Sequence, residues 1–175
     1  MRVAPFLIAT ALLALPAAES QMVEDQALLE QLQRLFPEAA SFSTKSGNPP
    51  HYKALAPSAS GQPPEVIGYA YWTTELEPLE RGYDGPIKML VGMDTNGVLK
   101  GIIVTEHREP YGYFSVDLPE FAEQFAGKSV RDRFKVGEDI DAISRATITV
   151  ESASRAVRNS SRRIARAYLV PPEQR

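Results

Sequence analysis

Two apolar runs joined by a tight turn constrain the fold of this chain more than any other feature of its sequence. Residues 87–94 and 98–106 are both rich in aliphatic and β-branched side chains, and Asn96-Gly97 lies between them. Asn-Gly is favoured in hairpin turns because both residues tolerate a positive φ angle. The sequence therefore predicts an antiparallel hairpin over residues 87–106.

The segment before the hairpin predicts another strand. Residues 65–74 are rich in β-branched and aromatic side chains, which favour extended structure. Alternation along a strand places Tyr69 and Tyr71 on one face of the sheet, opposite Trp72. Packing within the sheet accounts for these aromatic residues, and stacking on a bound planar ring is the alternative role.

Helical periodicity is found near both ends of the chain. Leucines recur at helical spacing within residues 22–36, and Pro37 ends that helix. A long helix is predicted from about residue 149 to 168, and a shorter helix ends at Gly127. Residues 38–64 are rich in Ser, Pro and Gly, and they predict a loop with room for one short strand.

The mixture of elements indicates an α+β fold in a single domain. Strands and helices do not alternate regularly, so we expect a mainly antiparallel sheet with flanking helices and a long C-terminal helix. No G-x-G-x-x-G or phosphate-loop motif occurs in the sequence, so the usual nucleotide cradles are not expected. The main domain is expected over residues 65–170, after a helix and loop over 21–64 and before a tail over 171–175.

Residues 1–20 predict a secretory signal peptide. The chain begins with Met1-Arg2, continues with an apolar run to Leu15, and has Ala-Glu-Ser at 18–20, which fits a small-x-small cleavage site. The apolar run is shorter than the roughly 20 residues that a membrane-spanning helix needs. We therefore expect an exported, periplasmic protein that is soluble after cleavage, with an uncleaved anchor as the alternative.

The composition excludes several classes of redox centre. The chain has 175 residues, no cysteine and two histidines. Disulfides, iron–sulfur clusters, thiolate zinc sites and C-x-x-C-H haem attachment all require cysteine. The net charge of −3 does not indicate a nucleic-acid partner. Any redox chemistry would therefore need an organic cofactor.

The long C-terminal helix is predicted to be amphipathic. At about 100° per residue, its apolar positions share one stripe and its arginines lie on the opposite stripe. The apolar stripe contains Val150, Ala153, Val157, Ile164 and Tyr168, and the basic stripe contains Arg155, Arg158, Arg162 and Arg166. Glu151 is placed to pair with Arg155. The basic stripe is either a solvated helix face or a surface that docks an acidic partner or anionic lipid.

Hydroxyl residues cluster where this helix begins. Ser144, Thr147 and Thr149 flank Arg145 and Ala146. The first turn of a helix has unpaired N–H groups and a partial positive charge. A threonine can cap those groups, or the same groups can bind a phosphate together with the guanidinium. The residues alone leave both roles open.

The stretch Asp-Ala-Ile-Ser-Arg-Ala-Thr-Ile-Thr over residues 141–149 resembles the D-x-x-S-G-A-T-x-T signature of FMN-binding domains. Such domains occur in the flavin subunits of the Rnf and sodium-pumping NADH:quinone oxidoreductase complexes, and in nitrous oxide reductase regulatory proteins. In this family a flavin transferase uses FAD to attach FMN, through its phosphate, to the threonine that corresponds to Thr147. The resemblance therefore implies covalent flavinylation at Thr147.

The resemblance extends upstream of the signature. Residues 82–87 (Gly-Tyr-Asp-Gly-Pro-Ile) are similar to a G-Y-x-G-x-I loop of the family, and the hairpin and a Glu-Pro loop follow in order. The resemblance covers roughly residues 65–168 and is closest to the nitrous oxide reductase regulatory branch. Arg145 departs from the signature, because the family has glycine there and glycine permits a positive φ angle.

The resemblance implies an FMN site at the start of the last helix. Besides Thr147, contacts to the cofactor are expected from Ser144, Arg145, Ala146, Thr149, Gly85, Ile87, His107 and Glu109. Glu106, His107 and Glu109 could instead hold a divalent ion, but hard-metal sites need more oxygen ligands, so no metal site is expected. A solvated strand end is the structural alternative for His107 and Glu109.

The function implied by the resemblance is electron transport by an exported flavoprotein. The chain is expected to be an electron carrier or a component of a redox complex rather than a stand-alone enzyme, and no catalytic residue is assigned. The expected partners are the flavin transferase and a membrane quinol or iron–sulfur redox protein. The alternative is a non-redox binding or regulatory module of the periplasm that has lost covalent flavin because of Arg145.

Overall fold

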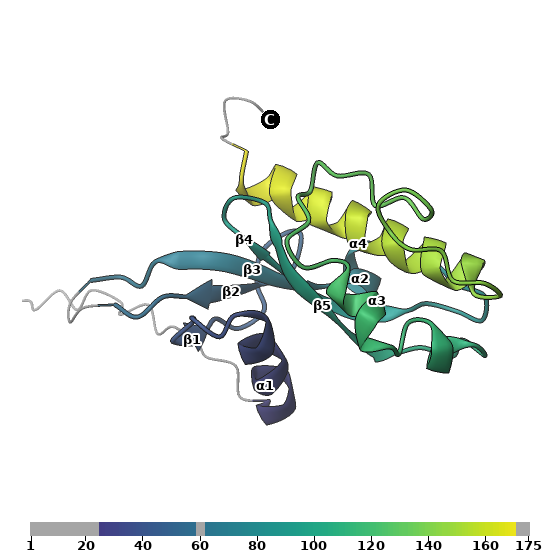
Figure 1. The fold of residues 1–175 in the computed structure, drawn as a ribbon. Helices are drawn as coiled ribbons and strands as arrows, with labels where there is room; N and C mark the ends of the chain where they lie inside the picture. Colours follow the sequence, from purple (N-terminus) through teal and green to yellow (C-terminus); the bar gives the residue numbers. More distant parts are fainter. Residues whose placement is uncertain (1–24, 59–61, 171–175) are drawn as a thin grey trace, which may run out of the picture.

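A computed structural model describes residues 25–58 and 62–170 of the chain. The signal peptide predicted over residues 1–20 and the tail over 171–175 lie outside these ranges. The described residues form a five-stranded antiparallel sheet with helices on both faces, which confirms the predicted α+β class (Figure 1). No helix within the two described ranges is long and apolar enough to cross a membrane.

The strands lie side by side in the order of the sequence. They are β1 (Ser41–Phe42), β2 (Tyr52–Leu55), β3 (Val66–Trp72), β4 (Lys88–Asp94) and β5 (Leu99–Glu106), and each pairs antiparallel with the next. The predicted hairpin is confirmed as β4 and β5. Its turn places Gly97 at a φ of +79°, and the Asp94 carboxylate accepts backbone N–H bonds within it.

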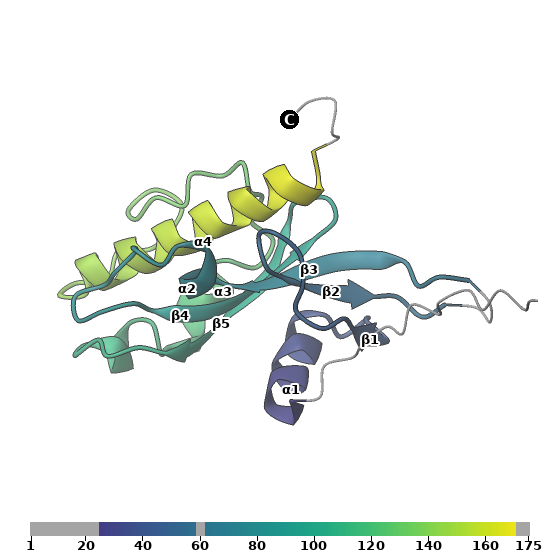
Figure 2. The ribbon, with the colours of Figure 1, turned by 180° about the vertical axis from the view of Figure 1, so that it is seen from behind.

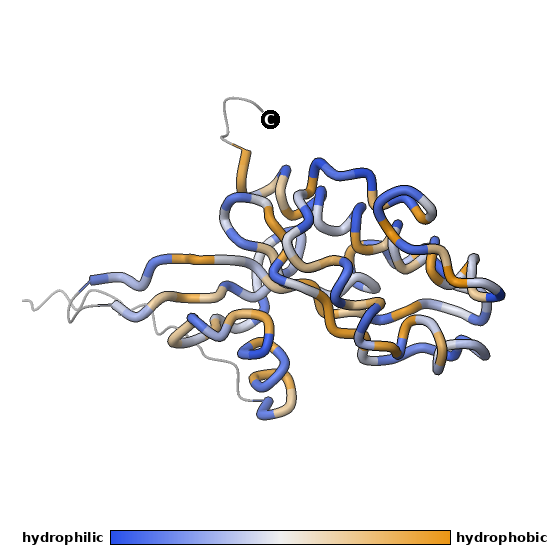
Figure 3. Tube along the Cα trace, in the orientation of Figure 1, coloured by the Kyte–Doolittle hydropathy of each residue, from blue (hydrophilic) through white to orange (hydrophobic). Residues whose placement is uncertain are grey.

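Two longer helices lie on opposite faces of this sheet. They are α1 (Gln26–Leu35) and α4 (Thr147–Tyr168), and the shorter elements are α2 (Thr73–Leu76), a 3-10 turn (Gly112–Phe114) and α3 (Pro119–Glu123). Seen from either side, α4 runs along one face of the sheet and α1 packs against the other (Figures 1 and 2). Figure 3 shows apolar and hydrophilic residues interleaved along both helices, as expected when one side of each helix is buried.

The two faces of the sheet bury separate apolar clusters because side chains alternate along each strand. On β4, Met89 and Val91 join the cluster beneath α4, whereas Leu90 joins the cluster beneath α1. On β3, Tyr71 is fully buried on the α4 face and donates a hydrogen bond to Ser161 Oγ at 2.8 Å. Burial raises the pKa of the Tyr71 phenol. Tyr71 is thus part of the protein core.

The α1 helix approaches the sheet closely because glycines lie beneath Phe36. An added Cβ at Gly68 would lie 2.4 Å from Phe36 Cε1, and one at Gly92 would lie 3.0 Å from Phe36 Cε2. Phe36 and Leu32 are both fully buried. Phe36, the residue after α1, therefore occupies the space that a side chain at Gly68 would need.

Several predicted boundaries are wrong. β3 ends at Trp72, before the expected Thr74, because Thr73 turns its hydroxyl to β4 and begins α2. That hydroxyl donates to Ile87 O and accepts the N–H of Met89, both at 3.1 Å. The strand β1 and the helix α2 were not expected, and α4 begins two residues earlier than expected.

The arginine stripe of α4 is not a solvated face along its whole length. Arg162 donates to Val130 O at 2.9 Å and to Asp132 O at 2.8 Å, so it holds the loop before α4. On the other flank, Arg155 pairs with Glu80 at 2.9 Å, and the carboxylate raises the pKa of the guanidinium. The predicted pair between Glu151 and Arg155 is confirmed at 3.6 Å.

Candidate functional site

The first turn of α4 is not capped by a side chain. Its N-cap is Ala146, whose methyl group accepts no hydrogen bond, and no acidic residue lies in the first turn. The expectation that Thr147 or Thr149 caps the helix is wrong, because the helix already begins at Thr147. By contrast, the Asp25 carboxylate caps α1 by accepting N–H bonds at 3.0 and 3.2 Å. The first N–H groups of α4 are therefore left without a side-chain acceptor at the N-cap.

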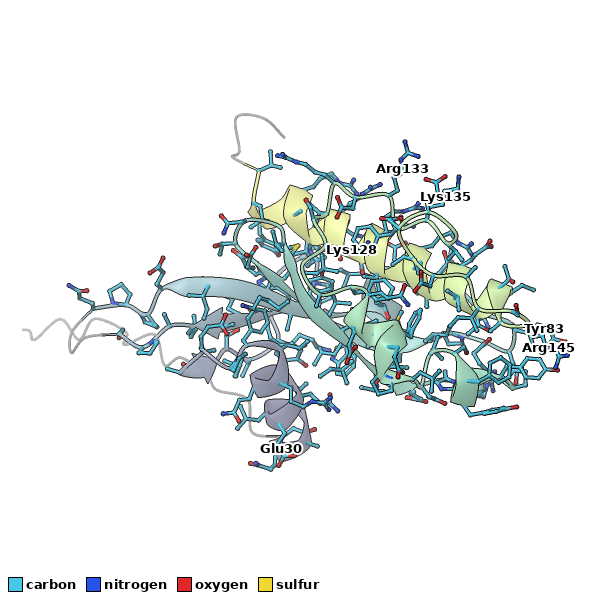
Figure 4. All side chains as sticks on the ribbon, viewed as in Figure 1. Glu30, Tyr83, Lys128, Arg133, Lys135 and Arg145 are labelled. Carbon is cyan, nitrogen blue, oxygen red and sulfur yellow. The ribbon has the colours of Figure 1, made fainter. Side chains whose placement is uncertain are left out.

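Arg145 adopts the backbone conformation that glycine would favour. Its φ angle is +69°, in the left-handed region. The side chain is exposed and has no ion pair or hydrogen bond to any part of the chain that the structure describes. Figure 4 shows Arg145 and Tyr83 at the same end of the molecule, where α4 begins. Arg145 thus has a backbone conformation that glycine favours, and it adds an unpaired positive charge.

The two threonines of the first turn have different environments. Thr147 is exposed, whereas Thr149 is only 3% exposed and donates its hydroxyl hydrogen to the Glu109 carboxylate. Residues two positions apart in a helix are rotated by about 200° around its axis, so the side chains of Thr147 and Thr149 point to opposite sides. Thr147 is available to a second molecule, and Thr149 is part of the interior.

Glu109 is buried and binds neighbouring segments rather than solvent. It is 6% exposed, and its carboxylate accepts the N–H of Tyr83 at 2.9 Å and of Asp84 at 3.0 Å as well as the Thr149 hydroxyl. We call Tyr83, Asp84, Glu109 and Thr149 the Glu109 cluster. The alternative of a solvated strand end is wrong for Glu109, because β5 ends three residues earlier at Glu106.

The glycine loop over residues 82–85 is fitted to this carboxylate. An added Cβ at Gly82 would lie 2.5 Å from Glu109 Oε1, so only glycine leaves room for the acid. Gly85 has a φ of +127°, and its carbonyl accepts the N–H of Gly82 at 2.7 Å. Ile87, expected as a cofactor contact, is 4% exposed and belongs to the cluster beneath α4.

His107 supports the backbone of the same cluster. Its Nδ1 accepts the N–H of Glu109 at 3.1 Å, so in the neutral ring the proton is on Nε2, which lies 2.6 Å from Asp117 Oδ1. An added Cβ at Gly112 would lie 2.2 Å from the His107 ring. Within residues 25–58 and 62–170, no three His, Cys, Asp or Glu side chains form a metal-binding group. Because its Nδ1 accepts the Glu109 N–H, His107 orients the backbone of Glu109.

A hollow of about 510 Å³ adjoins the glycine loop. It is lined by Thr74, Glu75, Pro86, Lys88, Glu106, His107 and Arg108. Clefts that bind cofactors have volumes of roughly 300–1,000 Å³. Arg108 also donates from Nε to Asp84 O at 3.3 Å, which joins the hollow to the Glu109 cluster. The hollow is large enough for a planar ring, and its lining has both cationic and anionic side chains.

The structure brings together most of the residues that the sequence singled out, but in different roles. Exposed Ser144, Arg145 and Thr147 surround the open helix start, whereas Thr149 and Glu109 bind one another beneath it. The N–H groups of Tyr83 and Asp84 and the close approach at Gly82 were missed, because backbone donors leave no side-chain pattern. The arrangement can place an anion on the helix amides and offer one hydroxyl beside it.

Comparison with known proteins finds a family model that matches this part of the chain. Residues 82–161 match the model described as the FMN-binding domain. This range contains the glycine loop, the hairpin, Glu109 and the start of α4. The match confirms the family resemblance recognised in the sequence.

Similar proteins come from several bacteria. The chain is 36% identical over 89 residues to a subunit of the ion-translocating oxidoreductase complex of Escherichia coli K12, covering 45% of this chain and 43% of the relative. It is 30% identical over 104 residues to a subunit of the Na(+)-translocating ferredoxin:NAD(+) oxidoreductase complex of Acetobacterium woodii, covering 55% and 48%. The regulatory protein NosR of Stutzerimonas stutzeri is 26% identical over 164 residues, covering 88% and 22%. The chain thus spans less than half the length of these relatives.

Proposed function

Residues 82–161 of this chain belong to the FMN-binding domain family, and from that premise we propose an electron-transfer protein with FMN attached through its phosphate to Thr147. The observation that carries this proposal is the exposed hydroxyl of Thr147 in the uncapped first turn of α4. The amides of that turn would bind phosphate oxygens, and Arg145 would add a charge-assisted contact. Bound FMN would supply one- and two-electron chemistry.

The attachment step is a phosphoryl transfer from FAD that a flavin transferase carries out. Thr147 Oγ forms a bond to the phosphorus on the FMN side of the FAD pyrophosphate. The bond from that phosphorus to the bridging oxygen breaks, AMP leaves, and the hydroxyl proton passes to a base of the transferase. No electrons are exchanged, and the product is a phosphodiester between Thr147 and the flavin.

The proposal places the protein in a chain of electron carriers outside the cytoplasm. The basis for export is the signal sequence expected over residues 1–20. The relatives that are named as subunits of oxidoreductase complexes support redox partners, either a membrane quinol or an iron–sulfur redox protein. A tethered flavin cannot diffuse away, which suits relay between such partners.

The alternative is a non-redox module that has lost covalent flavin. Its basis was the arginine at the glycine position of the signature. Arg145 nevertheless keeps a φ of +69°, so the substitution does not redirect the backbone into the helix. The observation favours an intact anchor over a lost one.

Co-expression of the full chain with a flavin transferase tests the proposal. The expected product is yellow, has the added mass of one FMN less one water, and keeps its fluorescence on a denaturing gel. Expression without the transferase is the matched control and should give protein of unmodified mass. Colourless protein of unmodified mass in the presence of an active transferase would refute the proposal.

A further inference from the structure

Glu109 is placed to control the geometry of the flavin anchor without touching the flavin. Resting on the proposed function, we infer that Glu109 is a positioning residue. It holds the first turn of α4 and the glycine loop in the arrangement that presents Thr147 and withholds Thr149. The choice between the two threonines thus depends on a carboxylate far away in the sequence.

The first step is that Thr149 is buried and bound to Glu109. Its hydroxyl hydrogen is donated to Glu109, and only 3% of the residue is exposed. Because Thr149 points about 200° away from Thr147, fixing one side chain inward fixes the other outward. A rotation of the first turn that exposed Thr149 would break its bond to Glu109.

The second step is the strength of the attachment to the loop. A buried carboxylate needs hydrogen-bond donors for both oxygens, since removing one leaves an under-solvated charge. No salt bridge forms to Glu109 within the described residues, so the Tyr83 and Asp84 amides and the Thr149 hydroxyl supply its donors. The helix start and the loop therefore cannot separate without uncovering this charge.

The third step is the direction of the carboxylate. A carboxylate that faced the phosphodiester would repel it, because both carry negative charge. Both Glu109 oxygens are instead occupied by donors from the protein. The Glu109 backbone is itself held, because its N–H donates to His107 Nδ1 and its carbonyl accepts the N–H of Gly112, both at 3.1 Å. Glu109 acts through Thr149 and the loop and is not itself a flavin ligand.

Amide hydrogen exchange of the full, flavin-free chain measures whether the cluster holds the loop. Glu109→Gln places an NH₂ group against a backbone donor, and Thr149→Val removes the hydroxyl with little change of shape. Both should speed exchange at Tyr83 and Asp84 by about tenfold or more. Thr149→Ser keeps the donor and should restore slow exchange. Tyr71→Phe is the matched control, because it removes a different buried hydrogen bond to α4 at Ser161.

Flavinylation of the same variants by the transferase and FAD separates positioning from general stability. At a temperature where all variants are folded, Glu109→Gln and Thr149→Val should be modified about tenfold more slowly. Thr149→Ser and Tyr71→Phe should match wild type. Equal modification rates in all variants would overturn the inference, as would loop exchange that Tyr71→Phe accelerates equally. If wild type itself takes up no flavin, the proposed function fails, while the exchange data still decide whether Glu109 holds the loop.

Discussion

The two ends of α4 differ in what they bury. At its start, Thr147 and Arg145 are exposed, and the buried Thr149 donates a hydrogen bond to the Glu109 carboxylate. At its end, the Tyr168 ring packs on His51 and Tyr69, with ring centroids 4.3 and 5.5 Å apart. His51 is 1% exposed. The start of α4 therefore exposes polar side chains, whereas its end is packed against aromatic rings.

The backbone of each end suits this difference. An added Cβ at Gly47 would lie 2.5 Å from the Tyr168 hydroxyl, so the loop before β2 closes tightly over the helix end. Arg166 lies in the last turn, where a cation offsets the partial negative charge of the helix terminus. The start has Ala146 as its cap and no acidic residue in the first turn. Only the start leaves its first-turn N–H groups without a side-chain cap, and an anion is proposed to bind there.

The largest expected effect is the loss of the anchor at the open end. Thr147→Ala removes the proposed nucleophile and should abolish the added flavin mass completely. Its effect on the free energy of unfolding should stay within about 0.5 kcal/mol, because the side chain is exposed. Mass spectrometry of protein co-expressed with the transferase measures the first effect, and urea unfolding measures the second.

Thr147→Ser is the matched control for this prediction. It keeps a hydroxyl at the same position and should keep part of the label. A label that persists in Thr147→Ala would place the anchor at Ser144 or elsewhere. It would also mean that the exposed hydroxyl of Thr147 gives the start of α4 no function that its end lacks.

Truncation of one side chain at each end should give unequal losses of stability. Tyr168→Ala removes the ring against His51 and a hydrogen bond to Pro49 O, and should cost about 2 kcal/mol. Ile148→Ala at the open end should cost less than about 0.5 kcal/mol, since Ile148 is 54% exposed. Chemical unfolding of both variants measures the difference. Equal losses would show that the start of α4 is packed as tightly as its end.

The closed end should also give stability a dependence on pH. Burial lowers the pKa of His51 below its ordinary 6.5, and a nearby lysine, Lys53, lowers it further, although the bond to Pro49 O opposes this. The ring is faced by Tyr69 and Tyr168, and its Nε2 has no hydrogen-bond partner in the described chain. The unfolded chain therefore takes up the proton more readily. This contribution to stability is complete above pH 6.5 and is lost as the pH falls through the folded-state pKa.

His51→Phe keeps an aromatic ring and removes the titrating group. Thermal unfolding midpoints of wild type and variant, compared between about pH 8 and pH 5, should show a shallower decline in the variant. His107 remains in both proteins, so the difference between the curves isolates His51. Parallel curves would show that His51 accepts a proton in the folded state as easily as in the unfolded chain.

Local chemistry explains which elements the sequence could predict. The hairpin follows from Asn96-Gly97 between two apolar runs, and α4 follows from its helical periodicity. β1 and α2 contain two and four residues, too few to show periodicity. They depend instead on distant contacts, such as those that the Thr73 hydroxyl makes with β4.

The sequence likewise predicted only part of the candidate site. Thr147 was predicted as the anchor because it occupies the threonine position of a recognisable signature. The buried role of Glu109 was not predicted, because its partners Tyr83 and Asp84 lie more than twenty residues earlier and donate backbone N–H groups. Arg145 was expected to disturb the backbone at the glycine position of the signature, whereas its φ angle is positive, as glycine favours. Sequence patterns indicated the proposed anchor but not the contacts around it.

The smallest expected effect concerns that backbone. A non-glycine residue in the left-handed region costs roughly 1–2 kcal/mol, and glycine regains this while losing about 0.5–1 kcal/mol through the freedom of the unfolded chain. Arg145→Gly should therefore raise the free energy of unfolding by about 0.75 kcal/mol, the difference between the midpoints of these two ranges. Arg145→Ala keeps the strain and loses only an unpaired side chain, so it should leave stability unchanged. If both variants had the stability of wild type, the left-handed backbone would not be strained, and the open end would differ from the closed end in exposure alone.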